Sequence, residues 1–255
     1  WPATRRVLDA LQRLLADERY PAVRRLVHAV VFCRLLEQAQ TRRLSDEQLA
    51  ELCQVLEQSS PDESAAAFAD RQPPSAAAGV LFRQSAAEYV RLHPRFHARP
   101  SWSERWRLAW AAWSFVRGQG QLPRLHPKFP DATFAQLEEP LGRQPPEIYQ
   151  PFARFIETTA LSWSYALSNR AGWSIVESLR MLALAYPTGL WLLRWAAAGR
   201  QPTVADVLDI ITALDRGQGY APLAGSKQRR RVQVLARLCD AETSELARLI
   251  VWYGR

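Results

Sequence analysis

Three histidines come closest to a metal-binding pattern in this chain. His93 and His97 are four residues apart, and His126 follows later in the sequence. Zinc sites use three or four such ligands, so a His/His/His or His/His/carboxylate site is the chemistry to consider. However, Pro94 disfavours helix at His93, and no HExxH glutamate lies between the first two histidines. We therefore expect no metal site, and the histidines should lie at a loop junction.

A run of basic residues suggests a second kind of chemistry, the binding of an anion. Lys227, Arg229, Arg230 and Arg231 come just before an apolar helix face that begins at Val232. Positive charges at a helix N-terminus oppose the helix dipole, so the run costs stability unless an anion or an acidic neighbour lies there. We expect these side chains at the solvent-exposed start of a helix. Two interpretations stay open: the run binds a phosphate-bearing partner, or it is solvated or paired with acidic residues of the same chain.

Four tryptophans form the least ordinary pattern of the chain. Trp102, Trp106, Trp110 and Trp113 are spaced by four, four and three residues, so on an α-helix their rings share one face. We call this set the tryptophan stripe. An indole ring buries about 200 Å² and needs a partner for its N–H, so the stripe must meet the core or a partner. We expect mostly buried rings with Trp106 and Trp110 central. The alternative is a surface for base stacking or for docking another domain.

No catalytic or cofactor motif emerges from the rest of the sequence. Serines and histidines that are close in sequence do not establish the geometry of a triad. Glu138 and Glu139 are adjacent, so they would point apart on a helix and make a poor acid/base pair. The glycines near residue 220 do not match a phosphate-binding loop. Catalytic residues are therefore unknown, no cofactor is expected in this chain, and whether it is an enzyme stays open.

Composition indicates a folded, basic protein. The chain has 255 residues, and its 48% hydrophobic content excludes disorder of the whole chain. The net charge is +8, but Lys128 and Lys227 are the only lysines among 33 basic residues. This preference for arginine is typical of the codon usage of a GC-rich genome. Because net charge concerns association and solubility, it is a weak argument for nucleic-acid binding here.

The cysteines indicate a reducing compartment. Cys33, Cys53 and Cys239 are odd in number, far apart and without a CxxC pair. A disulfide framework or a self-contained zinc site is therefore not expected. Cys33 and Cys53 lie among apolar residues at helical spacing, where a free cysteine is usually a small buried hydrophobe. We expect a cytoplasmic protein.

The most apolar stretch, Met181–Leu193, is too short to cross about 30 Å of hydrocarbon. Pro187 and Gly189 interrupt it, which predicts two helices, near 173–186 and 188–198, that meet at a buried turn. No membrane span is expected.

Helical periodicity dominates the chain, whereas strand signals are nearly absent. Ser45 with Gln48 forms a capping box, and Thr203 is a good N-cap. We predict an all-α protein, an irregular multi-helix bundle of about nine to eleven helices. The expected organisation is an N-terminal three-helix unit (1–59), a linker with a helical pair that carries the tryptophan stripe (60–117), a Pro-rich loop (118–146) and a C-terminal helical bundle (147–255). These parts could also form one continuous domain.

A set of amphipathic helices resembles a known family. Its residues are Arg24, Arg25, Leu26, Val27, His28, Leu35, Leu36 and Glu37, the helix from Ser45, the block Ile148–Ala198 and the helix Val204–Leu214. This pattern resembles the C-terminal helical region of the flagellin lysine-N-methylase group and its cysteine-cluster relatives. In that group a cysteine-rich segment, which binds a metal or an iron–sulfur cluster, precedes the helical region. The defining cysteines are absent here, so neither the cluster nor methyl transfer can be assigned to any residue of this sequence.

The first residue is Trp1 rather than an initiator Met, and we expect an excised domain or the C-terminal part of a longer protein. The resemblance then implies a non-catalytic helical portion of a larger cytoplasmic cysteine-cluster metalloprotein or methylase-like enzyme. Its role would be to shape a substrate or partner site, with a metal cluster in the segment before Trp1. We expect an intramolecular or protein partner. The alternative function is a binding module for an anionic partner such as nucleic acid.

Overall fold

The computed structural model describes residues 2–39, 41–69, 72–91, 102–125, 127–167, 172–217, 226–240 and 243–254. The fold is all-α, as the sequence predicts, and ten of the described helices have seven residues or more. The only strands in these ranges, β1 (Cys239–Asp240) and β2 (Thr243–Ser244), form a two-residue antiparallel pair. The prediction of an irregular bundle of about nine to eleven helices is confirmed.

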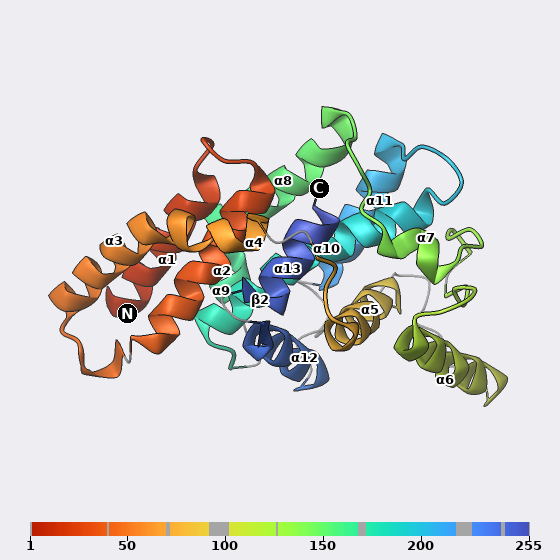
Figure 1. Ribbon diagram of the computed structural model, residues 1–255, viewed down its shortest axis with the longest axis horizontal. Helices are drawn as coiled ribbons and strands as arrows, with labels where there is room; N and C mark the ends of the chain where they lie inside the picture. Colours follow the sequence, from red (N-terminus) through yellow and green to blue (C-terminus); the bar gives the residue numbers. More distant parts are fainter. Residues whose placement is uncertain are drawn as a thin grey trace.

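The elements follow one another along the chain without a regular repeat (Figure 1). The first part contains α1 (Pro2–Ala16), α2 (Ala22–Gln38), the 3-10 helix η1 (Thr41–Arg43), α3 (Asp46–Glu63), α4 (Ala65–Ala69), α5 (Ala76–Arg91) and α6 (Trp102–Arg117). The second part contains α7 (Phe134–Glu138), α8 (Pro146–Leu161), α9 (Ser164–Leu167), α10 (Ile175–Ala196), α11 (Val204–Asp215), α12 (Ser226–Arg237) and α13 (Glu245–Tyr253).

Helices α1, α2 and α3 pack against one another. The capping box at the start of α3 is present: the Ser45 hydroxyl accepts from the Gln48 backbone N–H, and the Gln48 side chain accepts from the Ser45 N–H. Helix α3 continues to Glu63, past the expected end near residue 59. Helices α1 and α2 also contact α8, α10 and α13, so the hydrophobic core extends from this unit into the second half of the chain.

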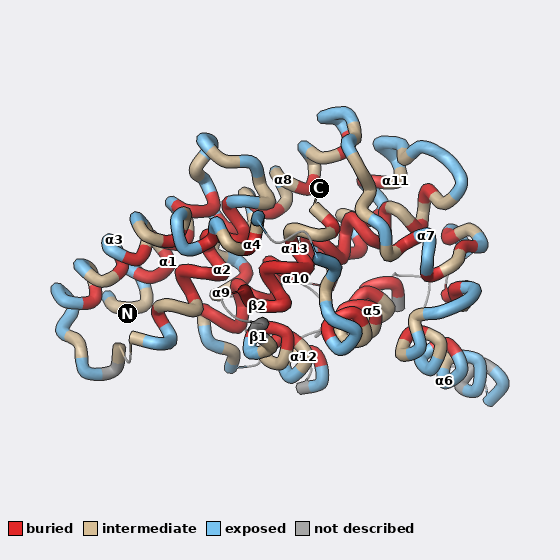
Figure 2. Tube along the Cα trace, viewed as in Figure 1, coloured by how far each residue is buried: buried red, intermediate tan, exposed pale blue. Residues whose placement is uncertain are grey.

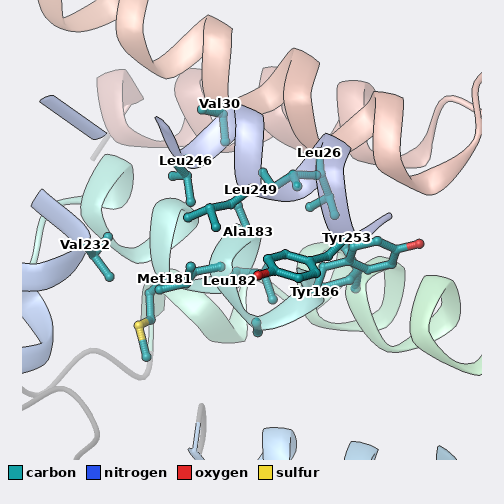
Figure 3. Close-up of a cluster of buried hydrophobic side chains, with 14 of the residues drawn as sticks. Leu26, Val30, Met181, Leu182, Ala183, Tyr186, Val232, Leu246, Leu249 and Tyr253 are labelled. Atoms are coloured by element: carbon teal, nitrogen blue, oxygen red, sulfur yellow. The ribbon is translucent and has the colours of Figure 1, made fainter. Parts of the chain in front are cut away.

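Helix α10 is the centre of the core, and nearly all its residues are buried. Helices α2, α12 and α13 pack on it. Figure 3 shows side chains from these elements in one buried cluster with Met181, Leu182 and Ala183 of α10: Leu26 and Val30 of α2, Val232 of α12, and Leu246 and Leu249 of α13. Burial of one large apolar cluster is the main force that holds the described helices together.

The expected turn at Pro187 was wrong, because α10 is one continuous helix of 22 residues. Proline removes one backbone donor, but in a fully packed helix the surrounding burial outweighs that loss. Gly189 is required for close packing rather than for a turn. A Cβ atom there would lie 2.7 Å from Phe152 Cε1 and 2.8 Å from Leu214 Cδ1. The glycine therefore lets α8 and α11 approach α10.

The segment 118–146, which the sequence predicts as a Pro-rich loop, contains one short helix, α7. The segment is nevertheless attached to the core. Leu122, Leu125 and Phe129 are buried, and the Leu122 N–H donates to the Ala132 carbonyl at 2.7 Å.

Helix α6 lies at the periphery of the described structure and is largely exposed (Figure 2). None of the helices in the described ranges combines the length and hydropathy needed to cross a lipid bilayer.

Candidate docking surface on helix α6

Helix α6 is held to the molecule by a narrow inner face. Ala111 and Phe115 are the buried residues among its described side chains, and they face α5, on which the helix packs. The Phe115 ring meets the Phe134 ring edge-on, with centroids 5.5 Å apart, and lies 6.2 Å from Trp195. The C-terminal part of α6 is therefore anchored in an aromatic cluster.

The tryptophan stripe is exposed. The relative exposure is 77% for Trp102, 73% for Trp106, 68% for Trp110 and 56% for Trp113. The expectation of mostly buried rings was wrong. Residues 102, 106, 110 and 113 lie opposite Ala111 and Phe115 on the helix, and the small alanine lets the inner face approach α5 closely. Periodicity places the four rings on one face but does not say whether that face turns inward.

Arg83 of α5 fixes the C-terminal end of α6. Its Nε donates to the Phe115 carbonyl at 2.9 Å, and its Nη1 lies 3.1 Å from Glu138 Oε1. A cation at a helix C-terminus satisfies carbonyls that lack an intrahelical donor and interacts favourably with the helix dipole. Gly118 follows directly, in the left-handed region with φ +62°. The stripe is thus presented by a helix whose end is rigidly held.

The charges around the stripe are basic. Arg107 and Arg117 are exposed. Arg117 comes four residues after Trp113 and seven after Trp110, so it shares their face. Between residues 102 and 125 the sequence has four arginines and one acidic residue, Glu104. An aromatic face with basic residues in and beside it favours an anionic partner over an acidic or purely apolar surface.

The basic run does not form one exposed cluster. Val232 and Leu235 are buried, as expected for the inner face of α12. The prediction that the whole run is solvent-exposed was wrong for Arg229 and Arg231, which are both partly buried. The Nε and Nη2 of Arg229 donate to the two carboxylate oxygens of Glu177 at 3.0 and 2.9 Å. Arg231 donates to Gln228 at 3.2 Å and lies 3.9 Å from Glu88.

Lys227 and Arg230 are the exposed members of the basic run. One interpretation of the run was that an acidic neighbour compensates its positive charges, and for Arg229 this neighbour is Glu177. Burial by itself would raise the pKa of Glu177, but hydrogen bonds from Arg229, Ser174 and Gln233 outweigh it and lower the pKa. The carboxylate therefore stays charged, and half of the predicted anion site is used for internal pairing.

His93, His97 and His126, which we expect at a loop junction without a metal, lie outside the described residues. Within the described ranges, no group of three or more His, Cys, Asp or Glu side chains could hold a metal ion. Cys33 and Cys53 are buried thiols, as their apolar neighbours predict. Burial raises the pKa of Cys33 to about 12. A thiol in this state is a poor nucleophile and a poor metal ligand.

Glu138 is a residue whose role the sequence did not indicate. It accepts from Arg83 and, at 2.6 Å, from the Tyr253 hydroxyl, while its backbone carbonyl accepts from the Trp252 indole. Burial is the main reason why the pKa of Tyr253 is raised well above its ordinary value. These bonds join α5, α7 and α13, and they support the end of α6 through Arg83. No sequence signal connects residues that are so far apart in the chain.

An apolar cavity of about 180 Å³ is a second candidate site. Its polar rim consists of Lys128, Asp206 and Asp209, of which Lys128 and Asp209 form an ion pair at 2.6 Å. Asp206 is paired with Arg200 and also caps α11 with Thr203. Since Lys128 and Asp209 are paired with each other and Asp206 is paired with Arg200, the described lining of the cavity presents no reactive constellation. Its walls are formed by Val90, Phe129, Leu192, Ala196, Ile210 and Ala213.

Comparison of this chain with protein-family models, with curated proteins and with solved structures finds no match.

Proposed function

We propose that this chain is a non-catalytic helical binding module that engages an anionic partner through the tryptophan stripe of α6. The single observation that carries the proposal is the exposure of all four stripe tryptophans on the face opposite the core. Together these rings expose on the order of 600 Å² of aromatic surface, which is as large as the largest apolar patch on a typical monomer. Such patches usually mark an interaction site.

The charge of the surroundings supports an anionic partner. Arg107 and Arg117 are exposed beside the rings. The run at 227–231 supports it less, because Arg229 is bonded to Glu177 and only Lys227 and Arg230 of its basic residues are exposed. The binding surface is therefore α6 rather than the start of α12.

The larger protein around this module is a separate proposal. The resemblance to the flagellin lysine-N-methylase group implies that the module is the helical portion of a cytoplasmic, cysteine-cluster, methylase-like protein. Any metal cluster and any methyl transfer would then depend on residues outside this sequence. The module would shape a substrate or partner site without supplying a catalytic residue.

The binding proposal is tested with two anionic probes, a single-stranded oligothymidylate and phosphatidylcholine vesicles that contain phosphatidylserine. Fluorescence anisotropy and co-sedimentation measure the binding of the chain and of the variant Trp106→Gln/Trp110→Gln. The proposal predicts binding to at least one probe, weakened by salt and by about tenfold or more in the variant, or at least about 1.4 kcal/mol. No binding to either probe, or equal binding by the variant, would overturn it. The melting temperature of the variant shows that it is folded.

A further inference from the structure

The anionic partner can be specified further from the shape and chemistry of the stripe. Helix α6 lies at the edge of the molecule (Figure 1). Its four exposed rings lie on the helix face opposite the buried Ala111 and Phe115. Resting on the proposed function, we propose that this partner is the headgroup layer of a phospholipid membrane that carries anionic lipids, and that the tryptophan stripe inserts its rings into it. The chain would bind the membrane surface without crossing it.

Indole rings suit the boundary between headgroups and acyl chains better than a dry protein interface. Each ring combines a large apolar body with an N–H that needs an acceptor when buried. A headgroup layer supplies phosphate and carbonyl oxygens as acceptors, which explains why tryptophan is enriched at membrane interfaces. Trp102, Trp106, Trp110 and Trp113 span about 16 Å along the helix axis, so all four rings can enter the layer while α6 lies in its plane.

Contacts with the rest of the protein already hold α6 so that the stripe can face the headgroup layer. Its inner face, with Phe115 and Ala111, stays packed on the protein, and Arg83 holds its C-terminal end. An interfacial helix normally turns a polar face to water. Here the protein itself covers the opposite face, so insertion requires no unpacking of the core.

Charge complementarity favours anionic over neutral lipids. Arg117 is exposed and lies on the face of the stripe, whereas the exposed Arg107 lies on the flank of the helix, between Trp110 and the inner face. Each basic residue near an anionic membrane surface contributes a free energy equivalent to about a fivefold gain in affinity.

Single-stranded nucleic acid fits the same surface less well. Proteins that bind it combine stacking aromatics with a basic groove that follows the phosphate backbone. The stripe is the ridge of one helix. Among the described side chains of α6, the exposed arginines are Arg107 and Arg117, which lie on opposite sides of Trp110 in sequence and do not form a second wall. An oligonucleotide is therefore the competing outcome of the test.

The experiment measures co-sedimentation of the chain with phosphatidylcholine vesicles with and without phosphatidylserine, and tryptophan emission in the same samples. We expect binding to the anionic vesicles with a blue-shifted emission. Trp106→Gln/Trp110→Gln should weaken it by about tenfold or more, and Arg107→Gln/Arg117→Gln by at least about fivefold. The variant Lys227→Gln/Arg230→Gln is the matched control, because it removes two exposed basic residues outside the stripe and should bind like the parent chain.

Three results would overturn the inference. The first is that the chain does not bind phosphatidylserine-containing vesicles better than neutral ones. The second is that the stripe variant still binds them, and the third is that the Lys227→Gln/Arg230→Gln control no longer does. If the chain binds oligothymidylate through the stripe but does not bind vesicles, the membrane inference fails while the proposed function holds. If it binds neither probe, both fail. The Arg107→Gln/Arg117→Gln variant retains all four tryptophans, so it tests the inference even where the stripe variant does not fold.

Discussion

The guanidinium of Arg83 occupies the space that any side chain at Gly118 would need. A Cβ atom at Gly118 would lie 2.4 Å from Arg83 Cζ, and the residue also has a positive φ of +62°. The glycine thus allows α6 to end where Arg83 can donate to the Phe115 carbonyl. The position of the tryptophan stripe depends on this close approach between residues 35 positions apart in the sequence.

Gly118→Ala should therefore destabilise the protein for two reasons, backbone strain and displacement of Arg83. We expect a loss of about 2–3 kcal/mol in the free energy of unfolding, measured by urea denaturation. Gly120→Ala is the matched control: Gly120 also has a positive φ, +77°, but nothing lies within 4 Å of a Cβ there. It should lose only the strain, about 1 kcal/mol. Equal losses in the two variants would show that the contact with Arg83 contributes nothing.

Trp106→Ala should leave the stability nearly unchanged, within about 0.5 kcal/mol, because its ring is mostly exposed. Trp195→Ala is the comparison within the same fold: that ring is fully buried, and its Nε1 donates to the Pro130 carbonyl at 3.1 Å. Its loss should cost about 3–5 kcal/mol. Thermal and urea unfolding of both variants measure the difference. A large loss for Trp106→Ala would mean that the stripe is part of the core after all.

Arg229→Gln and Arg230→Gln should have different effects on the free energy of unfolding, although the two residues are neighbours in the basic run. Removal of Arg229 leaves the buried carboxylate of Glu177 without its bidentate partner. We expect a loss of about 1–3 kcal/mol, below the full value for a buried pair because the arginine is partly exposed. Arg230 is exposed, so its replacement should change stability by less than about 0.5 kcal/mol. Denaturant unfolding of the single variants tests this, and equal effects would refute the internal pairing.

His28 should make stability depend on pH. Burial, followed by the nearby charge of Arg24, lowers its pKa from 6.5 to about 4. Between these two values the unfolded chain takes up a proton that the folded chain does not, so the free energy of unfolding decreases as the pH falls through this window. Above pH 6.5 His28 is neutral in both the folded and the unfolded chain, so its full contribution to the free energy of unfolding is retained there.

The variant His28→Gln removes this titration. Urea unfolding measures how much the free energy of unfolding decreases between about pH 7 and about pH 4.5. This decrease should be smaller in the variant than in the parent chain by about 1–3 kcal/mol. Any contribution of the other histidines is common to both proteins and cancels in this comparison. The same decrease in both proteins would show that His28 is not held neutral.

Local signals predicted the fold class and several helix ends. The capping box at Ser45 and the N-cap at Thr203 are short-range hydrogen bonds, and both are present where the sequence places them. The break at Pro187 was wrong because tertiary packing around Gly189 overrides the local preference. Local chemistry is thus readable from the sequence wherever distant contacts do not outweigh it.

The candidate site could be predicted only in part. Spacing placed the four tryptophans on one face, but the choice between core and surface depends on what packs against Phe115 from α5, α7 and α10. Likewise, nothing within α12 shows that Glu177 of α10 bonds to Arg229. Both outcomes depend on contacts between residues far apart in the sequence, which a single sequence does not reveal.

The most direct test of the central claim is hydroxyl-radical footprinting of the tryptophans, read by mass spectrometry, with and without phosphatidylserine-containing vesicles. Buried Trp191 and Trp195 serve as internal references. We predict that Trp106 and Trp110 are oxidised much faster than these references in the free chain and become protected when the vesicles bind. Oxidation of Trp106 and Trp110 as slow as that of Trp191 and Trp195 in the free chain would contradict the account. So would the absence of protection in vesicle-bound protein.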